Sequence, residues 1–93
     1  MSLFTFILEY DGGTYIKQIE SDSPENASII WAKSLEIYSI KGLGPASKEA
    51  IIQEMKWADK SPVPIEGVKN VWFSSFLVRG ELGCINIIKT VKK

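Results

Sequence analysis

The residues best suited to chemistry form a short glycine-rich stretch, Gly42-Leu43-Gly44-Pro45, with Lys41 before it and Lys48 after it. Glycines let a backbone approach a ligand closely, and the free amides at the start of a helix attract anions. Two lysines beside such amides add positive charge. The stretch could therefore bind phosphate groups of a nucleic-acid backbone, with Lys41, Gly42, Gly44 and Lys48 as the contacts.

This stretch resembles the hairpin of the helix-hairpin-helix family, which binds DNA backbone without sequence preference. Gly42 and Gly44 match the two glycines of that family, and Leu43 matches its apolar anchor. The other matching residues are Pro45, Ile51 and Ile52. The chain departs from the family at Ala46, where a basic residue is common, and at Lys48, where a small residue is common. The resemblance implies a DNA-backbone contact within residues 41–52.

The same stretch can also be a plain corner between two helices, because glycine commonly ends a helix and proline commonly begins one. The charge of the chain favours this interpretation. Eleven Lys and Arg residues balance 11 Asp and Glu residues, so the formal net charge is zero. Dedicated nucleic-acid binders are usually basic, since much of their affinity comes from neutralising phosphates. We therefore expect a corner and keep backbone binding as the alternative.

The composition excludes several classes of enzyme and metal site. The chain has no histidine and a single cysteine, Cys84, which excludes Ser-His-Asp and Cys-His systems and a zinc site within one chain. Lys17 keeps a second alternative open, because a lysine in a pocket with Tyr10 and Tyr15 could bind a small ligand or act as a base. More often such a lysine extends its ammonium group to water. We expect no cofactor, no metal and no enzymatic activity.

Length and hydrophobicity indicate one globular domain, residues 1–93. The chain is 45% hydrophobic, which is too apolar for a disordered segment. The N-terminal sequence lacks a basic region, and its apolar run ends at Glu9, so it is not typical of a signal peptide. No apolar run is long enough to span a membrane. We expect a cytoplasmic protein without membrane contact.

Four segments rich in β-formers predict two hairpins. Their ranges are 3–10 and 14–20 for the first hairpin, and 69–79 and 82–91 for the second. Asp11-Gly12-Gly13 and Arg79-Gly80-Glu81 separate the segments, and tight hairpin turns need residues that accept positive φ. Alternation along the first hairpin gives a core face made of Phe4, Phe6, Leu8, Tyr10, Tyr15, Lys17 and Ile19.

Two helices are expected between the hairpins. The first begins after Ser23, which can cap it, and runs to about Ile40. Its apolar stripe is Ala27, Ile30, Trp31, Leu35 and Tyr38. The second begins at Pro45 or Ser47 and ends near Trp57. The order ββααββ predicts an α+β fold in which two hairpins form an antiparallel four-stranded sheet, with both helices on one face. Whether the hairpins pair within one chain or across two stays open.

The second hairpin is apolar on both faces, although two helices can cover only one face of a sheet. The other face is expected to meet a partner, and a second copy is the commonest one. The expected anchors are Trp72, Phe76, Ile85 and Ile87. The opposite face offers Phe73, Leu77 and Ile88 instead. We predict a protein–protein interaction module that binds itself as a homodimer, or another protein.

Overall fold

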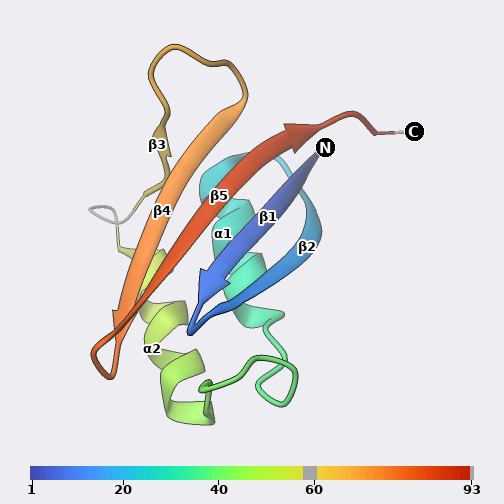
Figure 1. Cartoon of the computed structure of the whole chain (residues 1–93). Helices are drawn as coiled ribbons and strands as arrows, with labels where there is room; N and C mark the ends of the chain where they lie inside the picture. Colours follow the sequence, from blue (N-terminus) through green and yellow to red (C-terminus); the bar gives the residue numbers. More distant parts are fainter. Residues whose placement is uncertain (58–60, 93) are drawn as a thin grey trace.

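The computed structural model of the chain describes residues 1–57 and 61–92. Within those residues, an antiparallel five-stranded sheet packs against two helices (Figure 1). The strands are β1 (Ser2–Tyr10), β2 (Gly13–Ser21), β3 (Val63–Pro64), β4 (Val71–Val78) and β5 (Glu81–Thr90). The helices are α1 (Pro24–Lys33) and α2 (Pro45–Lys56). The strand order is β2-β1-β5-β4-β3, and both helices lie behind the sheet in the view of Figure 1.

The predicted α+β class and antiparallel sheet are confirmed, but the sheet has five strands and the element order is ββααβββ. The additional strand, β3, pairs Val63 with Phe73 and Pro64 with Trp72. Sequence reasoning treated this segment as an extended loop because of its prolines. An edge strand tolerates proline, since its outer backbone groups need no partner.

The first hairpin has the predicted position and turn. Asp11 and Gly12 form its two-residue connection with φ angles of 47° and 79°, and Tyr10 pairs with Gly13. Positive φ at both central residues is the geometry of a type I′ turn, which matches the twist of the flanking strands. The register continues without interruption to Ser2 and Ser21. The predicted core face of this hairpin is therefore the face that meets the helices.

The second hairpin turns at Arg79 and Gly80, with φ angles of 52° and 79°. Its second strand, β5, pairs with β1 of the same chain along eight residues, from Leu3↔Thr90 to Tyr10↔Gly83. This pairing answers the open question of how the hairpins meet, because both belong to one continuous sheet within one chain. The first and last strands of the sequence thus lie side by side at the centre of the sheet.

The first helix is shorter than predicted. Ser23 caps α1 as expected, and its side chain accepts a hydrogen bond from the backbone N–H of Asn26. However, α1 ends at Lys33 instead of near Ile40. The Ser34 hydroxyl donates to the carbonyl of Trp31, and the Lys17 ammonium donates to the carbonyl of Ser34. These bonds satisfy carbonyls at the end of the helix and help to stop it there.

Residues after α1 continue as turns that still reach the core. Leu35 and Ile40 are buried, whereas Tyr38 is 98% exposed, so the predicted helical stripe is wrong beyond Trp31. Ile30, another member of that stripe, is 45% exposed. A stripe at helical spacing cannot distinguish one long helix from a helix followed by turns, because both can bury several of the same residues.

Aromatic side chains fill the core between sheet and helices. The rings of Phe6 and Trp31 stack at a centroid distance of 5.5 Å, and both residues are buried. Tyr10 and Phe76 flank Gly83 in one row across the sheet, with ring centroids 5.6 Å apart. A Cβ at Gly83 would overlap the Phe76 ring, so only glycine leaves room for this packing.

Candidate functional site

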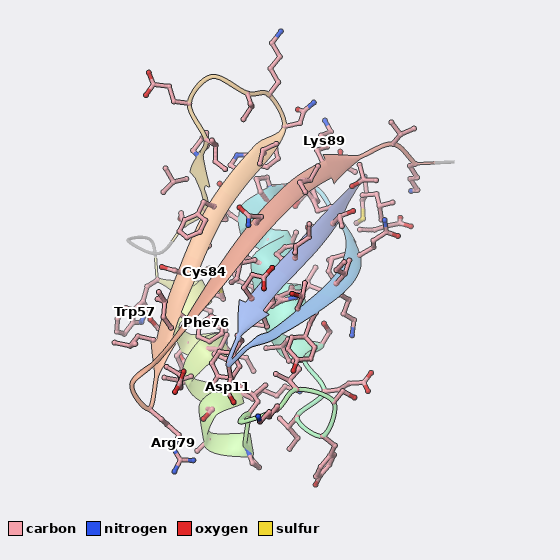
Figure 2. All side chains as sticks on the ribbon, viewed as in Figure 1. Asp11, Trp57, Phe76, Arg79, Cys84 and Lys89 are labelled. Atoms are coloured by element: carbon pink, nitrogen blue, oxygen red, sulfur yellow. The ribbon has the colours of Figure 1, made fainter. Side chains whose placement is uncertain are left out.

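The uncovered face of the sheet is the face that carries no helix, and Figure 2 looks onto it. It contains alternate residues of every strand, since neighbours along a strand point to opposite faces. One row across it, from β2 to β3, is Ile16, Ile7, Asn86, Phe73 and Val63. Because cross-strand partners share a face, these register positions form two apolar pairs, Ile16 with Ile7 and Phe73 with Val63, on either side of Asn86. No helix of the described chain covers this row.

Apolar residues that are exposed or half-buried gather on the β3–β4–β5 side of this face. We call this surface the apolar patch, and it consists of Val63, Val71, Phe73, Leu77, Leu82 and Ile88. Leu77 and Leu82 are direct cross-strand partners, exposed by 62% and 58%. Val71 and Ile88 are also partners and are half-buried. The patch therefore continues along the β4–β5 hairpin, from its turn toward its open end.

The β1–β2 side of the same face is mostly polar, although it also carries Ile7 and Ile16, and several of its polar side chains are bonded to one another. Thr14 donates to the carboxylate of Glu9 at 2.8 Å, and the amide of Gln18 donates to the hydroxyl of Thr5 at 3.2 Å. Glu9 and Glu20 are the only charged residues that β1, β2, β4 and β5 place on this face. The uncovered face thus has an uncharged apolar region beside a polar border, which is the composition of many protein interfaces.

The first set of expected anchors, Trp72, Phe76, Ile85 and Ile87, lies on the opposite face of the sheet, which the helices cover. Phe76, Ile85 and Ile87 are 1%, 1% and 0% exposed, because the helices cover their face of the sheet. Trp72 packs partly buried against the same core, with its ring edge-on to Phe4 at 5.9 Å. In this fold that face is the hydrophobic core and is not available to a partner. The alternative set, Phe73, Leu77 and Ile88, lies on the uncovered face.

Three residues of the patch were not among the expected anchors: Val63, Val71 and Leu82. Leu82 and Val63 were not predicted as surface anchors, although both are exposed by about 60%. The signal for Leu82 was its place two residues before Cys84 on the same strand face. Val63 gave no signal, since its strand has two residues and pairs with β4 through a register that sequence patterns do not show. Arg79 and Leu77 also line an open hollow of about 350 Å³, together with Val78 and the first turns of α2.

The glycine-rich stretch forms a turn that leads into α2, and other side chains of the same chain surround it. Gly42 has a φ of 82°, Leu43 is buried, and Gly44 is the N-terminal cap of α2. The backbone N–H of Lys41 donates to the Tyr15 hydroxyl at 3.2 Å. A Cβ at Gly42 would lie 3.0 Å from the Asp11 carboxylate. A carboxylate beside the glycine repels phosphate, so the local electrostatics do not favour an anion there.

The geometry around this corner also differs from a helix-hairpin-helix. In that family the glycine turn joins two helices directly, but α1 ends at Lys33, well before Gly42. Lys41 is exposed and Lys48 is half-buried near the start of α2. The four predicted phosphate contacts therefore lie in one region of the chain. The helices α1 and α2 do pack against each other, but the glycine turn does not join them directly as the resemblance implied.

The predicted ligand pocket is only partly present. A groove of about 440 Å³ lies between β2 and residues 34–40, and Tyr15 and Lys17 line it. Tyr10 does not line it, because its ring is buried against Phe76. Burial raises the pKa of the Tyr10 hydroxyl above its ordinary value of 10.0, and the carboxylates of Glu81 and Asp11 raise it further. The groove is open, and its single lysine ammonium donates to the carbonyl of Ser34 at 3.0 Å.

The described part of the chain holds no group of three or more His, Cys, Asp or Glu residues that could bind a metal ion. Cys84 is half-buried on the uncovered face, beside its cross-strand partners Glu9 and Ser75. Among the helices described, none has the length and apolar character needed to cross a membrane. Comparisons with protein-family models, with curated proteins and with solved structures find no significant match.

Proposed function

We propose that the chain is a protein–protein interaction module that works as a homodimer, with the apolar patch as its contact surface. The observation that carries the proposal is the exposure of the patch on a sheet face that no helix covers. Exposed apolar surface costs free energy in water, at roughly 25 cal/mol for each Å². A second copy can cover it with an identical patch through a two-fold axis, which is the commonest symmetry of homo-oligomers.

The size of the face suits such a contact. Its four longest strands have 8 to 10 residues. Strands of that length, spaced about 4.8 Å apart, cover roughly 600 Å² in flat projection. Side-chain relief increases the accessible area above that value. A standard interface buries about 800 Å² on each partner. The apolar patch occupies the β3–β4–β5 part of this face, so a contact of standard size would also bury part of the β1–β2 side.

The charge distribution also favours a second copy. The formal net charge of zero removes long-range repulsion between copies. Charged residues are depleted at the centres of protein interfaces, and the patch contains none. The carboxylates of Glu9 and Glu20 lie on the polar border of the face. Two patches can therefore meet without placing a charge in an apolar environment.

Sedimentation velocity from low to high micromolar concentration tests this proposal. The wild-type chain is expected to change from monomer to a larger species as its concentration rises. Leu77→Lys places a charge inside the contact and is expected to weaken association at least about tenfold. Gln53→Lys adds the same charge on exposed α2 and serves as the matched control. A wild-type chain that stays monomeric, or equal association of both variants, would overturn the proposal.

A further inference from the structure

The two outer edges of the sheet differ in how well they are protected. On one side, the two-residue β3, in a segment that contains Pro62 and Pro64, pairs only with Trp72 and Phe73 of β4. Within the described residues this leaves 74–78 of β4, a stretch shorter than β2, without a strand on its outer side. On the other side, β2 is nine residues long, contains no proline and pairs with β1 without a bulge. Short edges and prolines are common devices that prevent pairing with another chain, whereas a long regular edge permits it. The β2 edge therefore offers a template for an added strand.

The turn geometry shows which backbone groups of β2 face outward. In a two-residue hairpin the closing pair, here Tyr10↔Gly13, exchanges both hydrogen bonds, and such pairs then alternate along the ladder. Odd-numbered residues of β2 thus bond to β1. The N–H and C=O groups of Thr14, Ile16, Gln18 and Glu20 point to the open edge. Within the described residues, no backbone hydrogen bond outside the sheet ladders involves these four residues.

The side chains along the edge also leave room for a second strand. Ile16 is 66% exposed beside the edge on the uncovered face. On the other face the open groove between β2 and residues 34–40 lies beneath Tyr15 and Lys17. An inward-pointing lysine can protect an edge, but the Lys17 ammonium is bonded to the carbonyl of Ser34 within its own chain. Side chains of an added strand could enter the groove on that face.

We propose that β2 pairs antiparallel with β2 of a second copy, with Ile16 of one chain directly opposite Ile16 of the other. In this register, residues whose backbone N–H and C=O groups point to the open edge lie opposite each other in the two chains. Thr14 then lies opposite Gln18 of the second copy. On the groove side it brings Tyr15 beside Lys17 of the second copy, and an ammonium group beside an aromatic ring is favourable.

Symmetric registers shifted toward the C-terminal end of β2 pair less favourable side chains. A shift by one residue places the two Lys17 side chains opposite each other, and like charges in that position are destabilising. A shift by two residues pairs Ile16 with Glu20 of the second copy, which is already engaged with Lys92. The register centred on Ile16 avoids both problems. It also joins the Ile7–Ile16 pairs of the two chains into one apolar row.

This edge contact is separate from the apolar patch and does not rest on the proposed function. The two-fold axis of an antiparallel strand pair stands normal to the sheet, so both uncovered faces stay on the same side. The patch lies over β3, β4 and β5, at the far side of the sheet from β2. Edge pairing therefore leaves the patch free, and variants of each surface can be tested independently.

Disulfide trapping tests the register. In a Cys84→Ser background, Ile16→Cys and Gln18→Cys each supply one thiol on the edge. Directly opposite residues of a hydrogen-bonded pair have Cα atoms about 5.5 Å apart, which a disulfide can bridge. In the proposed register the two Gln18 positions are displaced by four residues, or about 13 Å along the strands, which is too far. Mild oxidation is expected to convert Ile16→Cys, and not Gln18→Cys, to a covalent dimer.

A proline variant then distinguishes disulfides that form through paired β2 strands from disulfides that form when two chains collide by chance. Gln18→Pro removes an outward N–H without breaking a bond to β1, and Gln18→Ala is the matched control that keeps this donor. Circular dichroism checks that both variants fold. Gln18→Pro is expected to reduce trapping through Ile16→Cys at least about tenfold, as two or more edge bonds are lost. Gln18→Ala is expected to leave it unchanged.

Trapping through Gln18→Cys, trapping at neither position, or an equal yield with Gln18→Pro and Gln18→Ala would overturn the edge proposal. Leu77→Lys distinguishes the two proposals, because it lies outside the edge. If that variant forms a smaller assembly than the wild type in sedimentation but is still trapped through Ile16→Cys, both contacts stand. If sedimentation is unchanged by Leu77→Lys while trapping holds, the edge contact stands and the patch contact fails.

Discussion

Phe76 and Leu77 are consecutive residues of β4, yet the first is 1% exposed and the second 62%. The helices cover the face that carries Phe76, whereas no described element covers the face that carries Leu77. The hairpin β4–β5 is therefore apolar on both faces for two different reasons. One face builds the core and gives the fold its stability, and the other stays exposed to solvent. Hydrophobicity alone does not tell these roles apart.

The largest effect on stability is expected when these two neighbouring residues are each replaced by alanine. Phe76→Ala removes a buried ring from the core and is expected to lower the free energy of unfolding by about 3–5 kcal/mol. Leu77→Ala removes an exposed side chain and is expected to change it by less than about 0.5 kcal/mol. Urea unfolding of both variants, at a concentration where the chain is monomeric, measures the difference. Similar losses for the two would contradict the assignment of faces.

Gly83 provides a second test of how tightly the covered face is packed. Gly83→Ala places a methyl group in the space of the Phe76 ring, and overpacking of this kind costs about 1–3 kcal/mol of stability. Gly44→Ser is the control, because no atom lies within 4 Å of a Cβ at that position. Gly44 is an N-cap, where serine is expected to stabilise by a few tenths of a kcal/mol. Thermal unfolding of the two variants should shift in opposite directions.

Much of this arrangement could be predicted from local sequence. Asp11-Gly12 and Arg79-Gly80 give both turns, and Ser23 gives the start of α1, because each depends on local backbone chemistry. The alternation around Phe6 gives the core face of the first hairpin. These features need no knowledge of distant residues.

The features that sequence reasoning missed depend on contacts between distant segments. The end of α1 at Lys33 involves Lys17 of β2, which bonds to the carbonyl of Ser34. The strand β3 exists because Val63 meets Phe73. The choice of covered face depends on where the helices pack. For this reason the expected anchors fell on the core side of β4 and β5, while the alternative set fell on the uncovered side.

Tyr10 gives a pH-dependent test of the covered face. Its pKa is raised above 10.0, chiefly by burial, so the unfolded chain loses this proton at lower pH than the folded chain. As pH rises above 10.0, unfolding is coupled to proton loss and stability falls. Tyr10→Phe lacks this proton. Urea unfolding from about pH 8 to about pH 11 should show a steeper loss for the wild-type chain. Parallel curves for the two chains would mean that Tyr10 is not buried as described.

The smallest effect is expected at the border of the uncovered face, where the Lys92 ammonium lies 2.8 Å from the Glu20 carboxylate. The hydrogen bond and charge of Lys92 hold the pKa of Glu20 below its ordinary value. Lys92→Ala should return that pKa toward the ordinary value, as an NMR titration of the Glu20 carboxyl carbon can show. Both side chains are about half exposed, so solvent and salt screen the pair and the unfolding midpoint should not move measurably. A measurable loss of stability would mean that this border contributes to the fold as the core does, and the contrast between the two faces would then be smaller than their exposure indicates.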